Sequence, residues 1–167
     1  MKAFLAAVIA LQFMLAGGAV ACSIPQPKGE VILTVDGMIN DCNEGLEVHF
    51  DEALFDALPH KTIKTENPWD QGSSTYEGVL LRDLMKYVKA DGQTATFTAL
   101  NDYRSDITLA DIDKYDVILA YKRDGEKLSV REKGPFFVVF PFTDVPELAV
   151  ESRYAQSVWQ VNRITVK

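Results

Sequence analysis

The chain has 167 residues, 47% of them hydrophobic, with 24 acidic against 17 basic residues. This length suits one domain with a buried core and leaves no room for a second. Because the acidic excess disfavours phosphate backbones as partners, we do not expect the protein to bind nucleic acid.

Residues 1–21 have the pattern of a secretory signal peptide. Lys2 precedes an apolar run from Ala3 to Met14, and the segment closes with Ala19-Val20-Ala21, which fits the small-x-small rule of signal peptidase. A membrane anchor is the alternative, but the run is short for a hydrocarbon core of ~30 Å. We therefore predict export to the periplasm, no transmembrane span after cleavage, and one mature domain over residues 22–167. Cleavage removes one lysine and no acid, so the mature net charge is −8.

The chain has two cysteines, Cys22 and Cys42. In an oxidising periplasm an even pair favours one disulfide, which would tie the mature N-terminus to the start of the domain. The alternative is a lipoprotein with a lipid on Cys22, because lipoproteins are also cut before a cysteine that follows a small residue. Ala19 stands where that cleavage motif usually has Leu, so the sequence favours the disulfide and leaves lipidation open.

The stretch from Glu66 to Val88 combines a polar loop with an amphipathic helix. Pro68, Gly72 and the hydroxyl residues up to Thr75 predict irregular structure around Trp69. The helix that follows has its apolar residues at helical spacing, namely Leu80, Leu81, Leu84, Met85 and Val88.

The remaining elements are mostly strands. Alternating or β-branched patterns predict strands over Glu30–Asp36, His60–Thr65, Thr94–Leu100, Tyr115–Lys122, Lys127–Val130, Phe136–Phe140 and Val158–Val166. A short helix is expected between Phe50 and Pro59, and Thr108 with Asp111 predicts the cap of one more helical turn. Strands outnumber helices without regular alternation, so the predicted class is α+β, mostly β.

Several motifs in a fixed order carry a resemblance to a known family. They are Leu33-Thr34-Val35-Asp36-Gly37, the Trp69 loop followed by Tyr76-Glu77-Gly78-Val79-Leu80-Leu81-Arg82-Asp83-Leu84, Asn101-Asp102-Tyr103, Ile118-Leu119-Ala120-Tyr121 with Asp124-Gly125, Lys133-Gly134-Pro135 and Trp159. In this order they resemble the molybdopterin-binding domain of the sulfite oxidase fold, over nearly the whole mature chain. The resemblance implies that fold as a single domain.

One departure from that family bears on function. Catalytic members carry a metal-binding cysteine upstream of the helix, where this chain reads Thr62-Ile63-Lys64-Thr65-Glu66. In this it resembles short, metal-free periplasmic members that bind a pterin and regulate a membrane-bound cyclic-di-GMP enzyme. The resemblance implies a reduced pterin such as a monapterin- or neopterin-like compound, no molybdenum and no catalysis. It names the periplasmic domain of an inner-membrane diguanylate cyclase or phosphodiesterase as the partner.

A pterin needs an aromatic surface for stacking and a carboxylate facing its amino edge. The candidate aromatic residues are Trp69, Tyr76 and Tyr103, and the candidate carboxylates are Asp102 first and Glu77 second, with Asp70 beside Trp69. Arg104 and Lys133 are candidates for holding the ligand's polar side chain or phosphate. Gly134 and Pro135 correspond to residues that line the pterin site in related enzymes.

Plainer roles compete with these assignments. Trp69 would equally pack its own loop, Asp102 would form an Asx turn at the strand end, and exposed basic residues are usually only solvated. Trp159 is expected in the core. The two histidines lack metal-ligand spacing. A pterin sensor, a molybdopterin-dependent oxidoreductase and an envelope interaction module without a ligand remain the three alternatives, in that order.

Overall fold

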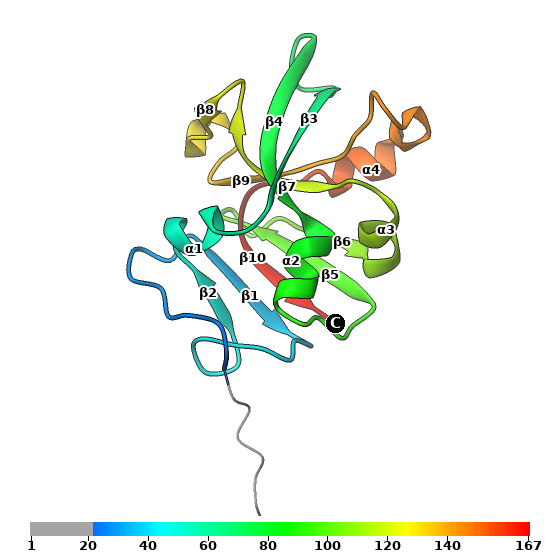
Figure 1. The fold of residues 1–167 in the computed structure, drawn as a ribbon. Coiled ribbons are helices and arrows are strands. Elements are labelled where there is room, and N and C mark those ends of the chain that lie inside the picture. The colour runs from blue at the N-terminus through cyan, green and yellow to red at the C-terminus, as the bar shows by residue number, and fades with distance from the viewer. Residues whose placement is uncertain (1–21) are drawn as a thin grey trace, which may run out of the picture.

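The computed structural model describes residues 22–167, so the signal peptide predicted for residues 1–21 lies outside the described part of the chain. Within residues 22–167, ten strands form one mixed sheet and short helices pack around it (Figure 1). The prediction of a single, mostly β, α+β domain is confirmed. None of the helices in this range is long and apolar enough to span a membrane.

The elements follow one another closely. The strands are β1 (Leu33–Gly37), β2 (Val48–Phe50), β3 (His60–Glu66), β4 (Ser73–Leu80), β5 (Thr94–Ala99), β6 (Arg104–Thr108), β7 (Ile118–Arg123), β8 (Glu126–Lys127), β9 (Phe136–Val139) and β10 (Trp159–Val166). The α-helices are α1 (Glu52–Asp56), α2 (Leu81–Tyr87), α3 (Leu109–Lys114) and α4 (Glu151–Gln156), and the 3₁₀-helices are η1 (Val130–Glu132) and η2 (Pro146–Leu148).

The last strand, β10, holds the sheet together. Its second half pairs in parallel with β1 and antiparallel with β5, and its first half pairs with β9. The register shifts between Trp159 and Val161, where Gln160 adopts a positive φ of 58°. Such a bulge turns the neighbouring side chain away from regular alternation. It therefore sets the direction in which Trp159 projects.

Strands β7 and β9 are buried on both faces. Successive side chains of a strand point to opposite sides of the sheet. Phe136 and Val138 accordingly enter the main core, while Phe137 and Val139 enter a second apolar cluster that packs against Trp69. The apolar run from Phe136 to Phe140 is explained by this two-sided burial.

The helix caps follow the sequence. The carboxylate of Asp51 accepts the amide of Leu54 at 2.9 Å and begins α1. The hydroxyl of Thr108 accepts the amide of Asp111 at 3.1 Å and begins α3, as the spacing predicts. These caps fix helix positions on the sheet without requiring long helices.

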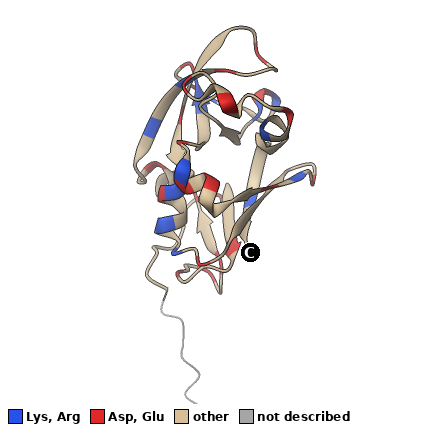
Figure 2. Ribbon diagram, turned by 90° about the vertical axis from the view of Figure 1, so that its right-hand side faces the viewer, with Lys and Arg blue, Asp and Glu red and all other residues tan. Residues whose placement is uncertain are grey.

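Charged residues of both signs are interspersed on the face that carries α2 and α3 (Figure 2). There Lys61 of β3 and Arg82 of α2 both pair with Asp116, at 3.1 and 2.5 Å. Burial alone would raise the pKa of Asp116, but hydrogen bonds from these two cations lower it. The three side chains therefore link β3, α2 and the segment before β7.

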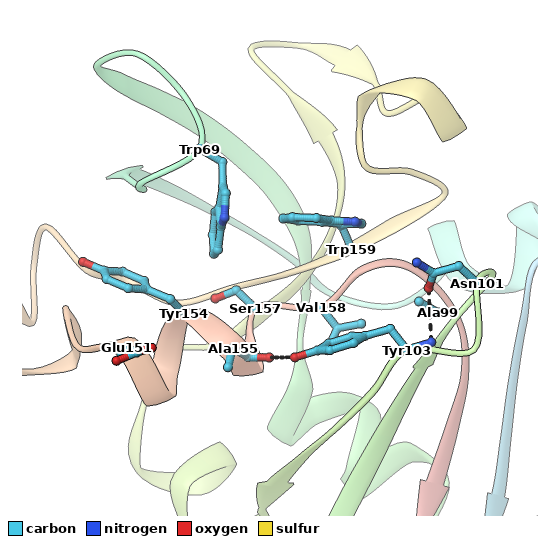
Figure 3. A pocket seen from close by; sticks show the side chains of 10 residues that line it. All are labelled: Trp69, Ala99, Asn101, Tyr103, Glu151, Tyr154, Ala155, Ser157, Val158 and Trp159. Atoms are coloured by element: carbon cyan, nitrogen blue, oxygen red, sulfur yellow. Dashed lines mark hydrogen bonds between the residues drawn. The ribbon is translucent and has the colours of Figure 1, made fainter.

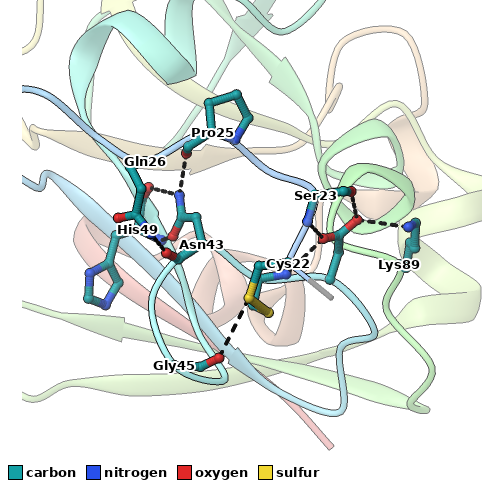
Figure 4. Close-up of a disulfide and its surroundings, with 10 residues drawn as sticks. Cys22, Ser23, Pro25, Gln26, Asn43, Gly45, His49 and Lys89 are labelled. Atoms are coloured by element: carbon teal, nitrogen blue, oxygen red, sulfur yellow. Dashed lines mark hydrogen bonds and ion pairs between the residues drawn. A yellow bond between two sulfur atoms is a disulfide. The ribbon is translucent and has the colours of Figure 1, made fainter. Parts of the chain in front are cut away.

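The N-terminal segment is fixed by a disulfide between Cys22 and Cys42 (Figure 4). Beside it, the buried carboxylate of Asp41 accepts hydrogen bonds from the amide and hydroxyl of Ser23 and pairs with Lys89 at 2.8 Å. These interactions, Lys89 foremost, lower the pKa of Asp41 well below its usual value. The predicted cysteine pairing is thus present in the structure.

Three sequence predictions about local structure are wrong. Regular structure resumes at Ser73, because Ser73–Thr75 pairs with Lys64–Glu66 of β3 and this pairing overrides the local preferences of the three hydroxyl residues. The strand expected over Lys127–Val130 is reduced to β8, Glu126–Lys127, and Val130 begins the 3₁₀-helix η1 instead. Besides these errors, β2, β6 and α4 are elements that the sequence does not predict. Trp159 does not lie in the core: 37% of its surface is exposed.

Candidate functional site

A cavity of about 390 Å³ opens on the side of the molecule where α4 meets the start of β10 (Figure 3). Its walls contain four aromatic side chains from four separate segments: Trp69, Tyr103, Tyr154 and Trp159. The other lining residues are Ala99, Asn101, Glu151, Ala155, Ser157 and Val158. The cavity is therefore mostly apolar, as small-molecule sites usually are.

Trp69 is the residue that joins the aromatic walls. Its indole meets Trp159 edge to face, with ring centroids 5.4 Å apart and planes at 90°. It meets Tyr154 at 5.9 Å and Phe137, in the second apolar cluster behind it, at 6.1 Å. Edge-to-face contacts of this kind are the preferred geometry of aromatic pairs, so the indole has a defined position.

The loop that carries Trp69 is shaped by Asn67. The side-chain carbonyl of Asn67 accepts the amides of Trp69 and Asp70, at 3.0 and 3.1 Å. This Asx-type turn replaces the ladder hydrogen bonds that end with β3. The amide group of Asn67 donates to the carboxylate of Asp70 at 2.9 Å and to the hydroxyl of Tyr76 at 2.8 Å, and the second contact holds the loop against β4.

Asp70 is the centre of a polar cluster behind Trp69. Its carboxylate accepts hydrogen bonds from Lys133 at 2.5 Å, from the hydroxyl of Tyr76 at 2.8 Å and from Arg123 at 3.3 Å. Burial by itself would raise the pKa of Asp70, but the hydrogen bonds from Lys133, Asn67 and Tyr76 outweigh it and lower the pKa to about 2. Burial, with the carboxylate of Asp70 alongside, raises the pKa of Tyr76.

Glu77 lies in a different cluster on β4. It accepts hydrogen bonds from Lys122 at 2.8 Å and from the hydroxyl of Tyr121 at 3.1 Å, and His60 lies 3.5 Å away. The hydrogen bond from Lys122 is the main cause that lowers the pKa of Glu77. Its charge is therefore balanced locally, and it does not line the cavity.

Of the candidate residues in and beside the β5–β6 turn, only one reaches the cavity. Tyr103 lines the cavity and its hydroxyl donates to the carbonyl of Ala155 at 2.9 Å, which links the turn to α4. Asp102 has a positive φ of 64° and its amide donates to the carbonyl of Ala99 at 3.0 Å, so it forms the turn. Neither Asp102 nor Arg104 lines the cavity.

Lys133, Gly134 and Pro135 do not line the cavity. Lys133 directs its ammonium to Asp70, and a Cβ on Gly134 would collide with the carbonyl of Leu128. Pro135 lines a separate, smaller cavity with Phe55 and Tyr121. Of the ten candidate residues, the structure thus places Trp69 and Tyr103 in the cavity wall, and Asp70, Tyr76 and Lys133 directly behind it. Their roles in ligand binding stay predictions.

Sequence reasoning missed Glu151, Tyr154 and Trp159 as residues of the site. Glu151 is the one acidic residue among the described residues of the lining, and the same lining contains no Lys or Arg. Both Glu151 and Tyr154 belong to α4, a helix too short for a periodic signal. The ion pair of Arg153 with Asp111 at 2.9 Å holds that helix to the fold.

The described residues offer no metal centre of their own: within residues 22–167, no group of three or more His, Cys, Asp and Glu residues is placed to hold a metal ion. The two cysteines of the sequence are bonded to each other. Neither therefore offers a free thiolate as a metal ligand.

Comparison with known proteins then places the chain. Residues 53–143, more than half of it, match the family model of the oxidoreductase molybdopterin binding domain. The chain belongs to this family. Among solved structures it is similar to the sulfane dehydrogenase SoxCD from Paracoccus pantotrophus, with a TM-score of 0.62 and 18% sequence identity, over 86% of this chain and 40% of that chain. No curated protein matches the sequence.

The molybdopterin-binding family implies a pterin cofactor with a metal, and this chain fits only part of it. The apolar, aromatic cavity suits a flat heterocycle. In the stretch Thr62–Glu66, where catalytic relatives are expected to hold the metal, the inward side chains are Ile63 and Thr65, and the hydroxyl of Thr65 accepts the amide of Thr143 at 3.1 Å. The residues present in this stretch therefore do not form a binding site for the metal. The described lining of the cavity also contains no Lys or Arg that could pair with a phosphate group.

Proposed function

We propose that this protein is a non-enzymatic, periplasmic pterin-binding protein that regulates a membrane-bound cyclic-di-GMP enzyme. The observation that carries the proposal is the aromatic cavity with one carboxylate and no cation, in a chain of the molybdopterin-binding family.

The ligand's ring is the part that this cavity recognises. A pterin is planar and aromatic, so it gains from contact with the rings of Trp69, Trp159 and Tyr103. Its amino and ring N–H groups are donors that need an acceptor, and Glu151 supplies the charged one. A phosphate group would be desolvated without a cation. We therefore favour a pterin with an uncharged, hydroxylated side chain.

The absence of a free thiolate favours sensing over catalysis. Molybdenum chemistry in this family needs a cysteine ligand, and here both cysteines are used in the disulfide. A protein that binds a metabolite without transforming it acts by presenting a different surface when loaded. The ligand must then bind the partner-competent form more tightly than the other form.

The cellular setting rests on the sequence and on the resemblance. The signal-peptide pattern and the cysteine pair both suit an oxidising, extracytoplasmic compartment. The resemblance to short metal-free relatives supplies the partner, the periplasmic domain of an inner-membrane diguanylate cyclase or phosphodiesterase.

Two measurements test the proposal. Protein purified from its own periplasm should release a pterin, identified by mass spectrometry and fluorescence, and should contain no molybdenum by elemental analysis. Near-stoichiometric molybdenum would instead favour the oxidoreductase, the second candidate that family membership supports. Calorimetry with the partner's periplasmic domain should give tighter binding in the presence of saturating pterin, and equal affinity would make the protein a carrier or store.

A further inference from the structure

Exposed apolar side chains gather at the mouth of the cavity. Of the eight large hydrophobic side chains that are exposed in residues 22–167, two line the cavity, Tyr103 (48% exposed) and Trp159 (37%). Leu100 (48%) lies between two lining residues, and Val130 (52%) is hydrogen-bonded through its carbonyl to the residue that follows Trp159. We call these four residues the mouth patch. Tyr103 and Trp159 also line the cavity (Figure 3), so the mouth patch is continuous with the proposed pterin site.

Gln160 holds the segments of the mouth patch side by side. The amide of Leu100 donates to the carbonyl of Gln160 at 3.0 Å, and the amide of Gln160 donates to the carbonyl of Lys133 at 2.9 Å. The side-chain amide of Gln160 donates to the carbonyl of Val130 at 2.7 Å. The β5–β6 turn, η1 and β10 are thus joined at the bulge of β10, which keeps the four residues of the patch on neighbouring segments.

The six arginines of the chain differ in whether they pair with a carboxylate. Four of the six, Arg82, Arg123, Arg153 and Arg163, pair with carboxylates. The other two, Arg104 and Arg131, are exposed, make no ion pair within the described residues, and directly follow Tyr103 and Val130. In a chain with an excess of acids, the arginines that lack a carboxylate are those beside the mouth patch.

Ligand binding does not account for these features. Leu100, Val130, Arg104 and Arg131 do not line the cavity. Monomeric proteins rarely expose contiguous apolar surface without a use for it, and aromatic residues and arginine are enriched in the centres of protein interfaces. The border carries both signs, because Asp102 and Glu132 are exposed beside the two arginines, but arginine is the charged residue enriched in interface centres. In a two-fold dimer the same two arginines would face each other, so we favour a partner that offers them carboxylates over another copy of this chain.

We propose that the mouth patch docks a folded protein domain whose surface has an apolar centre bordered by Asp or Glu. This rests on the proposed function, which names that domain as periplasmic and regulated by the pterin. Because Tyr103 and Trp159 belong to both the cavity and the patch, a bound pterin ring covers one side of the docking surface and fixes both side chains. Ligand and partner thereby share two residues, which couples their binding.

Site-specific photo-cross-linking in cells of the source organism tests the docking surface. A photoreactive amino acid at Leu100 or Val130 should give an adduct with one inner-membrane protein, mapped by mass spectrometry to an apolar peptide flanked by acidic residues. The control is the same amino acid at Leu46, which is 72% exposed and lies outside the patch. Adducts no stronger than at Leu46, or an adduct only with a second copy of this chain, would overturn the proposal.

Variants with reversed charge provide a second test of the docking surface. Arg104→Glu with Arg131→Glu should weaken binding to the purified domain of the cross-linked protein by about tenfold or more, and Lys28→Glu, an exposed control far from the patch in sequence, should not. Affinity for 7,8-dihydroneopterin should stay unchanged in these variants. Equal loss in the Lys28 variant contradicts the proposal. If neither the parent protein nor any variant binds the pterin, the result contradicts the proposed function. The docking surface is then still tested by the cross-linking experiment.

Discussion

The indole of Trp69 stands at 90° to that of Trp159, and their centroids are 5.4 Å apart. The two residues come from the β3–β4 loop and from the start of β10, so only the folded sheet brings them together. They are the two tryptophans of the sequence, and both line the cavity. The site therefore has its own spectroscopic reporters.

The first prediction uses these reporters. Trp69→Ala or Trp159→Ala should weaken binding of 7,8-dihydroneopterin by roughly tenfold or more, because loss of an aromatic contact typically costs ~1–3 kcal/mol. Trp69→Phe and Trp159→Phe should keep much of the affinity and assign the fluorescence quenching to one indole at a time. Unchanged affinity in both alanine variants, with native circular dichroism, would place the ligand elsewhere.

The second prediction decides which carboxylate faces the ligand. Glu151 lies in the cavity wall, whereas Asp102, the first candidate from the sequence, forms the neighbouring turn. Glu151→Gln should weaken pterin binding by about tenfold, since a charged hydrogen bond contributes more than a neutral one. Asp102→Asn, which suits the same positive φ, is the matched control and should leave the affinity unchanged. The opposite result would restore the assignment made from the sequence.

Most of the fold could be predicted because its strands alternate or run apolar over several residues. The unbroken apolar run Phe136–Phe140 predicts the buried strand that the structure has at Phe136–Val139, and Thr108 with Asp111 predicts the start of α3 from a local hydrogen-bonding rule. The residue types of Ser73–Thr75 do not predict a strand, because the pairing that makes them one comes from Lys64–Glu66 of β3. Asp124, 49 residues further along, also exchanges hydrogen bonds with Thr75. Local preference carries no information about such partners.

The candidate site was only partly predictable for a similar reason. Trp69 could be recognised as an indole in a polar loop. Trp159 lies in a strand that alternates, and only the bulge at Gln160 explains why it projects into the cavity. Carboxylates near Trp69 in sequence were plausible ligands, but Asp70 is engaged by Lys133 and Arg123, two cations that follow it by more than 50 residues.

The third prediction concerns the pH dependence of stability. The pKa of Asp70 falls from 3.8 to about 2 on folding, because hydrogen bonds from Lys133, Asn67 and Tyr76 outweigh its burial. A lowered pKa contributes stability above the unfolded value, and that contribution is lost as the pH falls from about 5 towards 2. Its size is about 2 kcal/mol.

Chemical denaturation between pH 2 and pH 7 measures this contribution. Asp70→Asn should lower the free energy of unfolding by about 2 kcal/mol or more at pH 6, and the difference from the parent should shrink as the pH approaches 2. Comparing the two proteins removes the contributions of other acids such as Asp41. Asp91→Asn, at an exposed position, is the control. A difference that stays constant over this range would contradict the role assigned to the cluster.

The fourth prediction concerns the disulfide. Cys22 and Cys42 are 20 residues apart, and a cross-link over a loop of this size stabilises a fold by about 3 kcal/mol. Replacing both by serine should lower the free energy of unfolding by about that amount. The exported protein should show no free thiol until it is reduced, which intact mass measures. A diacylglyceryl adduct on Cys22 would favour the lipoprotein alternative.

The last prediction isolates the bulge that directs Trp159. Gln160 has a φ of 58°, a conformation that costs residues with a Cβ roughly 1–2 kcal/mol and glycine almost nothing. Gln160→Gly and Gln160→Ala both lose the side-chain hydrogen bond to Val130, but only the alanine variant keeps the unfavourable φ. The glycine variant should therefore be the more stable of the two by about 1 kcal/mol in chemical denaturation. In a regular strand the order would be the reverse, since glycine there is less stable than alanine by about 0.5–1 kcal/mol, so the sign of the difference reports whether the bulge is present in solution.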